Sequence, residues 1–253
     1  MTFASWHNPP AHSLLAIAHR GGAALGPENT AAAFEAAAAA GADAVETDVR
    51  VSADGTLVCL HDADLQRLCG DPRAVADLDL AMLRSLLPGL LTLDAAIAAS
   101  APLGILLDIK LMDYALLPKI IRAVETGGGF QRAILGLRHE KLIAEARRIS
   151  SEIAILAFLP DAHSAPRAAR LGANWFRLWQ ADADEARIAA ARQAGLQVAV
   201  MVGQPRDIPL PEYPQFPVGQ VDADGLAQLY LLAPDAIMLD DPRLLRRSLL
   251  SMD

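Results

Sequence analysis

Residues 175–202 read WFRLWQADADEARIAAARQAGLQVAVMV and contain a complete strand–helix–strand unit. Residues 175–179 and 197–202 are short and rich in bulky apolar side chains, which is typical of parallel strands covered on both faces. Residues 184–194 between them combine Ala, Arg and Glu as an amphipathic helix does, and Gly195 stands where a left-handed cap residue belongs. The stretch therefore predicts one repeat of a parallel α/β sheet.

The same alternation extends along the whole chain and gives eight strand–helix units in 253 residues. An open doubly wound sheet usually has about five or six strands and a Gly-rich phosphate turn, so eight units favour a (β/α)8 or TIM barrel. The expected strands are residues 14–19, 44–49, 104–109, 133–137, 153–158, 175–179, 197–202 and 235–240, and the expected helices are residues 30–40, 93–99, 114–125, 140–149, 165–171, 184–194, 225–232 and 242–250.

The connection after the second expected strand is longer than the others. Residues 50–92 contain a turn at Asp54-Gly55, an extended run at 57–60, and a polar segment that passes through Pro72 and Pro88-Gly89. We interpret this connection as a hairpin and a short insertion. The chain over residues 1–253 is then a single catalytic barrel domain, and the segment around His7 is expected to be disordered.

Composition excludes several kinds of partner. The formal net charge of -8 and the pI near 5.2 argue against nucleic-acid binding, which requires a clustered basic surface. No uncharged apolar run reaches the roughly 18 residues of a transmembrane segment, and no basic segment precedes a hydrophobic run at the N-terminus. Two cysteines are too few for a disulfide framework. The sequence predicts a cytoplasmic protein with a small-molecule ligand.

Titratable residues gather where the first strands end, which is where a barrel places its catalytic groups. Glu46 and Asp48 are two residues apart and share one face of a strand, and Asp108 lies on the next expected strand. Buried like charges are costly without a cation, and an all-oxygen cluster suits one Mg²⁺ or Ca²⁺ ion, with Mn²⁺ as a further option. The alternative is that these acids form structural salt bridges with Lys110, Arg20 or Arg50.

Two histidines flank the predicted metal site. His19 ends the first strand and His61 ends the extended run, and two imidazoles can act as general base and general acid. We assign His61 as the acid and His19 as the base. Arg20 and Lys110 supply positive charge for a phosphodiester and its transition state. Trp179 adds bulk to the sixth strand and is expected to wall a pocket, with ordinary packing as the alternative.

Five motifs in this order resemble the glycerophosphodiester phosphodiesterase family: His19-Arg20-Gly21, Pro27-Glu28-Asn29-Thr30, Glu46-x-Asp48, His61-Asp62 and Asp108-x-Lys110. The resemblance implies a (β/α)8 barrel that hydrolyses glycerophosphodiesters to glycerol 3-phosphate and an alcohol. It also implies a site in which Glu46, Asp48 and Asp108 bind the metal, His19 and His61 form the acid–base pair, Arg20 and Lys110 hold the phosphate, and Glu28 and Asn29 support the substrate site.

The sequence departs from the family pattern in places. Asp108 stands where the family usually has Glu, and Asp-x-Lys at this place also looks like the sphingomyelinase D enzymes. Two alternatives therefore stay open: phosphoryl transfer that gives a cyclic phosphate, and a noncatalytic barrel that binds a phosphorylated metabolite. Residues 136–138 read Gly-Leu-Arg where the family often shows Ser-Phe, and residues 200–203 lack its common Trp-Thr pair. These changes imply a rebuilt alcohol or glycerol subsite.

Overall fold

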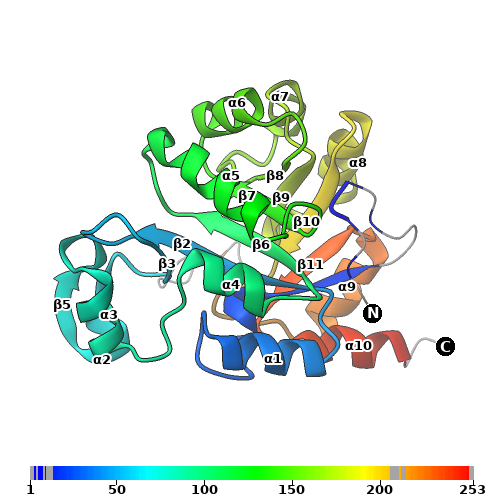
Figure 1. Cartoon of the computed structure of the whole chain (residues 1–253). Coiled ribbons are helices and arrows are strands. Elements are labelled where there is room, and N and C mark those ends of the chain that lie inside the picture. The colour runs from blue at the N-terminus through cyan, green and yellow to red at the C-terminus, as the bar shows by residue number, and fades with distance from the viewer. Residues whose placement is uncertain are drawn as a thin grey trace.

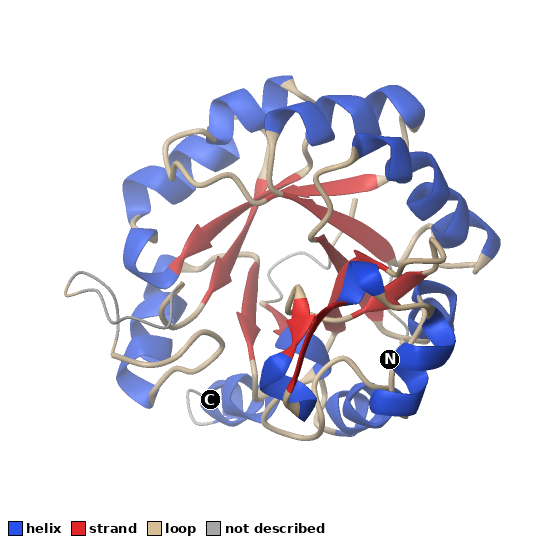
Figure 2. Ribbon diagram, turned by 90° about the vertical axis from the view of Figure 1, so that its left-hand side faces the viewer, coloured by secondary structure: helices blue, strands red, loops and turns tan. Residues whose placement is uncertain are grey.

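The computed structural model describes residues 3, 5–7, 9, 14–205, 211 and 215–250, with side chains described up to residue 246. Eight parallel strands form a closed barrel, because the first strand pairs with both the second and the last. The predicted TIM barrel is confirmed, and Figure 2 shows the ring of helices around it. The barrel strands are β1 (Leu15–Ala18), β2 (Ala44–Val51), β6 (Gly104–Ile109), β7 (Ala133–Leu137), β8 (Ala154–Ala157), β9 (Trp175–Trp179), β10 (Gln197–Met201) and β11 (Ala236–Leu239).

Local sequence signals set the ends of the helices. The Thr30 side chain accepts a hydrogen bond from the Ala33 backbone N–H, and Asp184 caps the helix after β9 in the same way. Gly195 ends that helix with a φ of 81°, as its sequence position predicted. The helices that follow the barrel strands are α1 (Ala31–Ala39), α4 (Leu93–Ala99), α5 (Leu117–Thr126), α6 (Glu140–Ile149), α7 (Ala165–Arg170), α8 (Glu185–Gln193), α9 (Ala223–Leu232) and α10 (Pro242–Leu250).

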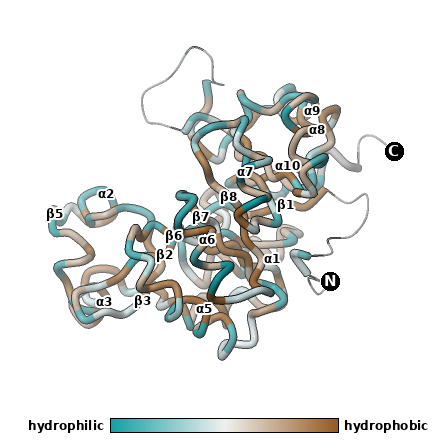
Figure 3. The backbone as a smooth tube through the Cα atoms, turned by 90° about the horizontal axis from the view of Figure 1, so that it is seen from above, coloured by the Kyte–Doolittle hydropathy of each residue, from teal (hydrophilic) through white to brown (hydrophobic). Residues whose placement is uncertain are grey.

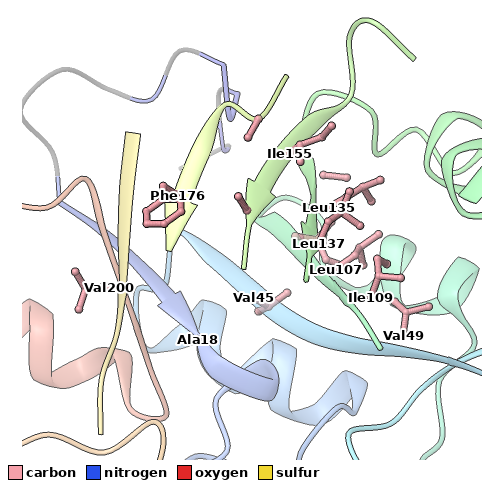
Figure 4. Packing of buried hydrophobic residues seen from close by; sticks show 14 of the residues in the cluster. Ala18, Val45, Val49, Leu107, Ile109, Leu135, Leu137, Ile155, Phe176 and Val200 are labelled. Carbon is pink, nitrogen blue, oxygen red and sulfur yellow. The ribbon is translucent and has the colours of Figure 1, made fainter. Parts of the chain in front are cut away.

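Side chains alternate between two apolar layers along each strand. One layer fills the space between the barrel and its helices, and Figure 4 shows members of it such as Val45, Leu107 and Phe176. The other layer fills the barrel interior and includes Ala44 and Leu106. Positions two residues further along β2 and β6 therefore also point inward, and these positions carry the predicted acidic residues.

The long second connection has more structure than its sequence predicted. Strand β3 (Leu57–Cys59) pairs antiparallel with β2, as the hairpin interpretation requires. The segment interpreted as polar contributes Leu65, Val75 and Leu83 to a further apolar cluster, separate from the two layers of the barrel. Figures 1 and 3 show it projecting from one side of the barrel. Its elements are β4 (Asp64–Leu65), α2 (Gln66–Cys69), β5 (Asp71–Ala74) and α3 (Leu80–Leu86).

The amino end of the barrel is closed by the N-terminal segment. Trp6 is only 1% exposed, and its indole N–H donates to the Arg132 carbonyl at 2.5 Å. The Trp175 indole N–H donates to the Trp6 carbonyl at 2.8 Å, and the two rings meet edge to face. The expectation of a disordered segment was wrong for these residues, because a large aromatic ring fits the open end of the barrel. Among the described helices, none is long and apolar enough to cross a membrane.

Candidate active site

Three carboxylates converge inside the barrel near its carboxyl end. Glu46 and Asp48 come from β2 and Asp108 from β6, and Asp48 lies opposite Asp108 in the strand register. One oxygen atom of each side chain lies within 4.8 Å of the other two, and all three residues are buried. Three closely spaced, buried carboxylate oxygens match the donor set that hard divalent cations prefer.

Two basic side chains already contact this cluster. The Lys110 ammonium group lies 2.9 Å from Asp48 Oδ1 and 2.6 Å from Asp108 Oδ2, and the Arg138 guanidinium donates to both oxygens of Asp108. The predicted salt-bridge alternative is thus present in part. Burial and then the nearby Asp48 carboxylate raise the pKa of Glu46, so the cluster still lacks positive charge at this residue. A divalent cation bound here would supply it.

Asn29 holds one of the predicted metal ligands in place. Its side-chain amide donates to Asp48 Oδ2 at 3.0 Å and accepts from the Thr47 hydroxyl at 2.7 Å. Asn29 has a φ of 58°, a left-handed conformation that Asn tolerates better than most residues. Although burial opposes ionisation of Asp48, the adjacent Lys110 keeps the pKa of its carboxyl below the usual value. Asp48 is therefore a fixed, ionised oxygen donor.

His19 directly follows β1 in a short turn of helix and is 7% exposed. Its Nδ1 lies 2.7 Å from Oδ1 of Asp240, which follows the last strand β11. Burial lowers the pKa of His19, but the bond to Asp240 and the charge of Glu46 outweigh it, so the pKa is raised. The sequence alone predicts no role for Asp240. The sequence signal that could have identified Asp240 is its position directly after β11, the strand that pairs with β1.

His61 follows β3 and has a carboxylate partner of its own. Its Nδ1 lies 2.8 Å from Asp62 Oδ1, and the Arg50 guanidinium donates two hydrogen bonds to the His61 carbonyl. Burial lowers the pKa of His61. Because the Nδ1 atoms of both His19 and His61 are bonded to carboxylates, Nε2 is the atom that each ring can offer to a substrate.

Arg67 of helix α2 links the two sides of the site. Its Nε donates to Asp62 at 2.6 Å, and its two terminal nitrogens donate to Glu28 at 3.0 and 2.5 Å. Glu28 in turn accepts from Arg20 at 3.0 Å. Burial opposes ionisation of Glu28, but the two arginines lower its pKa. The insertion therefore connects the Asp62 partner of His61 with Arg20, a contact that the sequence did not predict.

These groups surround a pocket of about 290 Å³ at the barrel mouth. Trp179 lines it, as expected, with the Arg177 guanidinium carbon 4.4 Å from the ring centroid. Arg138, Phe158 and Arg177 also line the pocket. Arg138 belongs to the segment 136–138 that implied a rebuilt subsite, and Arg177 shares the bulky sixth strand with Trp179, whereas Phe158 was not predicted. The pocket brings together His19, Arg20, Glu46, His61, Asp108, Lys110 and Trp179, and the predicted residues Asp48, Asn29 and Glu28 are joined to it by the ion pairs and hydrogen bonds described above.

A sequence model of the glycerophosphoryl diester phosphodiesterase family matches residues 19–201. The chain therefore belongs to this family, as the motifs predicted. The probable glycerophosphodiester phosphodiesterase 1 of Mycobacterium tuberculosis is 49% identical over 70 residues, which are 28% of this chain and 26% of that protein. The aligned region thus spans about a quarter of this curated relative.

Solved structures resemble the chain over nearly its whole length. A glycerophosphodiester phosphodiesterase from Agrobacterium tumefaciens has a TM-score of 0.75 and 25% identity, over 92% of this chain and 99% of the other. A phosphodiesterase from Oleispira antarctica, solved with the product sn-glycerol-3-phosphate, has a TM-score of 0.75 and 22% identity, over 93% of this chain and 96% of the other. The Oleispira antarctica structure shows that the two chains share a fold.

Proposed function

We propose that the chain hydrolyses glycerophosphodiesters to glycerol 3-phosphate and an alcohol, with one divalent cation held by Glu46, Asp48 and Asp108. The cluster of these three carboxylates, beside a pocket that two carboxylate-bonded histidines line, carries the proposal. Membership of the family supports it. The glycerol 3-phosphate in the Oleispira protein supports the substrate class, since that ligand is its named product.

Mg²⁺, Ca²⁺ and Mn²⁺ are the candidate ions, because every donor in the cluster is an oxygen. The bound ion supplies Lewis-acid stabilisation of charge on the phosphate oxygens. Arg20 and Lys110 line the pocket and add positive charge where the transition state becomes more negative. Asn29 keeps Asp48 in place, so we assign it a positioning role.

His19 and His61 form the acid–base pair in this proposal. The sequence-based order has His61 as the acid, whereas the raised pKa of His19 and the lowered pKa of His61 favour the opposite order. A cation bound by Glu46 would counter one of the charges that raise the pKa of His19. Diesters with a nitrophenol leaving group separate the two orders, because an alanine variant that lacks the acid recovers and one that lacks the base does not.

The glycerol hydroxyl next to the phosphate is a candidate internal nucleophile. If it attacks first, a substrate with hydrogen in its place loses turnover by orders of magnitude, and a cyclic glycerophosphate is itself hydrolysed. Attack by water predicts only the loss of one contact, about 1–3 kcal/mol. The comparison of the two substrates shows which group attacks the phosphorus.

Phosphorus NMR of product formation tests the activity itself. Release of glycerol 3-phosphate from glycerophosphoglycerol, glycerophosphoethanolamine or glycerophosphocholine supports the proposal. Formation of a cyclic phosphate from lysophosphatidylcholine favours the sphingomyelinase D-like alternative. Binding without turnover of all four favours a noncatalytic barrel.

Two broader expectations stay predictions. One is that residues 1–253 act as a single catalytic domain, with residues 50–92 as its hairpin and insertion. The other is a cytoplasmic location, which the two free thiols of Cys59 and Cys69 support. Fractionation of cells that express the chain checks the location.

A further inference from the structure

Part of the pocket lining is built from arginines and aromatic rings, and Arg138 in this part contacts Asp108. Arg138 follows β7, Phe158 follows β8, and Arg177 lies in β9. The guanidinium carbons of Arg138 and Arg177 lie 5.3 and 5.4 Å from the centroid of the Phe158 ring, and Arg177 also lies over Trp179. Guanidinium groups therefore cover the aromatic faces that could otherwise bind a quaternary ammonium group.

A second hollow begins at this part of the lining and is larger than the first. It has a volume of about 770 Å³, and Arg138 lines both hollows. Its other lining residues come from the segments after β6, β7 and β8, which is the same end of the barrel as the carboxylates. We call this hollow the side groove. A substituent of the phosphate that reached past Arg138 would enter the side groove.

The side groove is basic although the chain as a whole is acidic. Four basic residues line it against the two acidic residues Glu140 and Asp161, in a chain with a net charge of -8. Arg167 is paired with Glu140, and Arg138 with Asp108. Within the part of the chain that the structure describes, no ion pair includes the two remaining basic residues, the exposed Lys141 and Arg170.

We propose that the chain prefers diesters whose alcohol carries an anionic group, phosphate or carboxylate, which the side groove binds beside Lys141 and Arg170. This inference rests on the proposed function and names its substrate class. Of the two substituents of a glycerophosphodiester, glycerol is uncharged, so selection by charge has to act on the alcohol. A choline substituent would meet guanidinium groups over the rings of Phe158 and Trp179, and further positive charge in the side groove. Both would repel its quaternary ammonium group.

Four diesters of glycerol 3-phosphate with small alcohols test the preference. The alcohols are ethylene glycol phosphate, glycolate, ethylene glycol and choline, so the first two distinguish a phosphate from a carboxylate. We expect kcat/KM to be about tenfold higher for an anionic alcohol than for ethylene glycol, since two exposed charge pairs each contribute modestly to binding. Choline should be the poorest substrate. The advantage should shrink in about 1 M salt, where the Debye length is about 3 Å.

A double variant, Lys141→Gln with Arg170→Gln, locates the preference in the side groove. We expect the kcat/KM ratio of anionic to uncharged substrate to fall about tenfold, mainly through KM, because these charges bind ground state and transition state alike. Arg148→Gln is the matched control. Arg148 lies on the same helix as Lys141 but is 70% exposed and paired with Glu145, so this ratio should not change.

Three results contradict the inference in distinguishable ways. Equal turnover of the four diesters, or faster turnover of the choline diester, overturns the anionic preference and leaves the proposed function in place. An anionic preference that survives the double variant places its origin outside the side groove. Failure to hydrolyse any of the four diesters with Mg²⁺, Ca²⁺ or Mn²⁺ overturns the proposed function and the inference together.

Discussion

The two ends of the barrel interior are filled by different kinds of side chain. At the amino end, Trp6 and Trp175 fill the interior with aromatic rings whose N–H groups are hydrogen-bonded. At the carboxyl end, the inward positions of β2 and β6 carry Glu46, Asp48 and Asp108. Burial there is costly, and basic side chains offset only part of the charge. The amino end is filled by apolar packing, whereas the carboxyl end carries buried charges, which is the arrangement that the proposed chemistry requires.

Removal of either histidine at the carboxyl end should have the largest effect on activity. We expect His19→Ala and His61→Ala each to lower kcat by about 10²–10⁴-fold, the usual contribution of a general acid or base. Thermal unfolding should change little in His61→Ala and more in His19→Ala, because the His19 ring is buried and hydrogen-bonded to Asp240. If a variant keeps more than about a tenth of the parental kcat, its loss is smaller than this range. The histidine that it lacks is then not part of the proposed acid–base pair.

At the amino end, the substitution Trp6→Ala should produce the reverse pattern. We expect it to lower the free energy of unfolding by about 3–5 kcal/mol, as for other buried aromatic side chains, with kcat unchanged where the variant is folded. Urea unfolding measures the first quantity and a steady-state assay the second. Leu231→Ala is the control, since Leu231 is 84% exposed. A large loss of kcat in folded Trp6→Ala would mean that the two ends are coupled.

Arg67 tests whether the insertion contributes to the carboxyl-end site. Removal of the Arg67 guanidinium takes a positive charge away from Asp62 and from the neighbouring His61. The pKa of His61 should therefore rise, and the limb of the pH–rate profile that reports His61 should move to higher pH. We expect Arg67→Ala to lower kcat/KM about tenfold. Arg67→Lys should recover only part of this loss, because a lysine ammonium group cannot make the two parallel hydrogen bonds that the planar guanidinium donates to Glu28. Arg73→Ala changes another exposed arginine of the insertion and should leave the profile unchanged. An unshifted profile in Arg67→Ala would limit Arg67 to a structural role.

Glu28→Gln should have the smallest effect of these substitutions. We expect it to lower the free energy of unfolding by an amount that depends on pH. The folded pKa of Glu28 lies below its usual value, so its ionisation stabilises the fold above the unfolded pKa, and this stabilisation is lost as the pH falls through the folded pKa. We expect the variant to be about 1 kcal/mol less stable at neutral pH, with the difference shrinking in acid. Denaturant melts of both proteins across this range measure it. A difference independent of pH would point to lost packing instead.

The sequence predicted the barrel well because the information is local. The bounds of β6, β7 and β9 match the expected ranges, since apolar runs between capped helices define each strand. The closeness of the carboxylates and histidines could be predicted as well, because strand ends in a barrel meet at one face, while their roles stay predictions. Trp6, Asp240 and Arg67 could not be predicted, because each acts through a partner far away in the sequence, such as Asp240 with His19 across 221 positions. Patterning within one segment carries no information on such pairs.

Metal dependence is the central claim, and one titration tests it most directly. The chain is stripped with a chelator, glycerophosphoglycerol turnover is followed by phosphorus NMR, and Mg²⁺, Ca²⁺ or Mn²⁺ is added back to the parent chain and to Asp48→Asn. We predict no turnover after chelation, recovery with at least one of these ions, and a much weaker metal response in Asp48→Asn, because that change removes ligand charge. Full activity in the chelated parent chain, or an unchanged metal response in Asp48→Asn, would contradict the account.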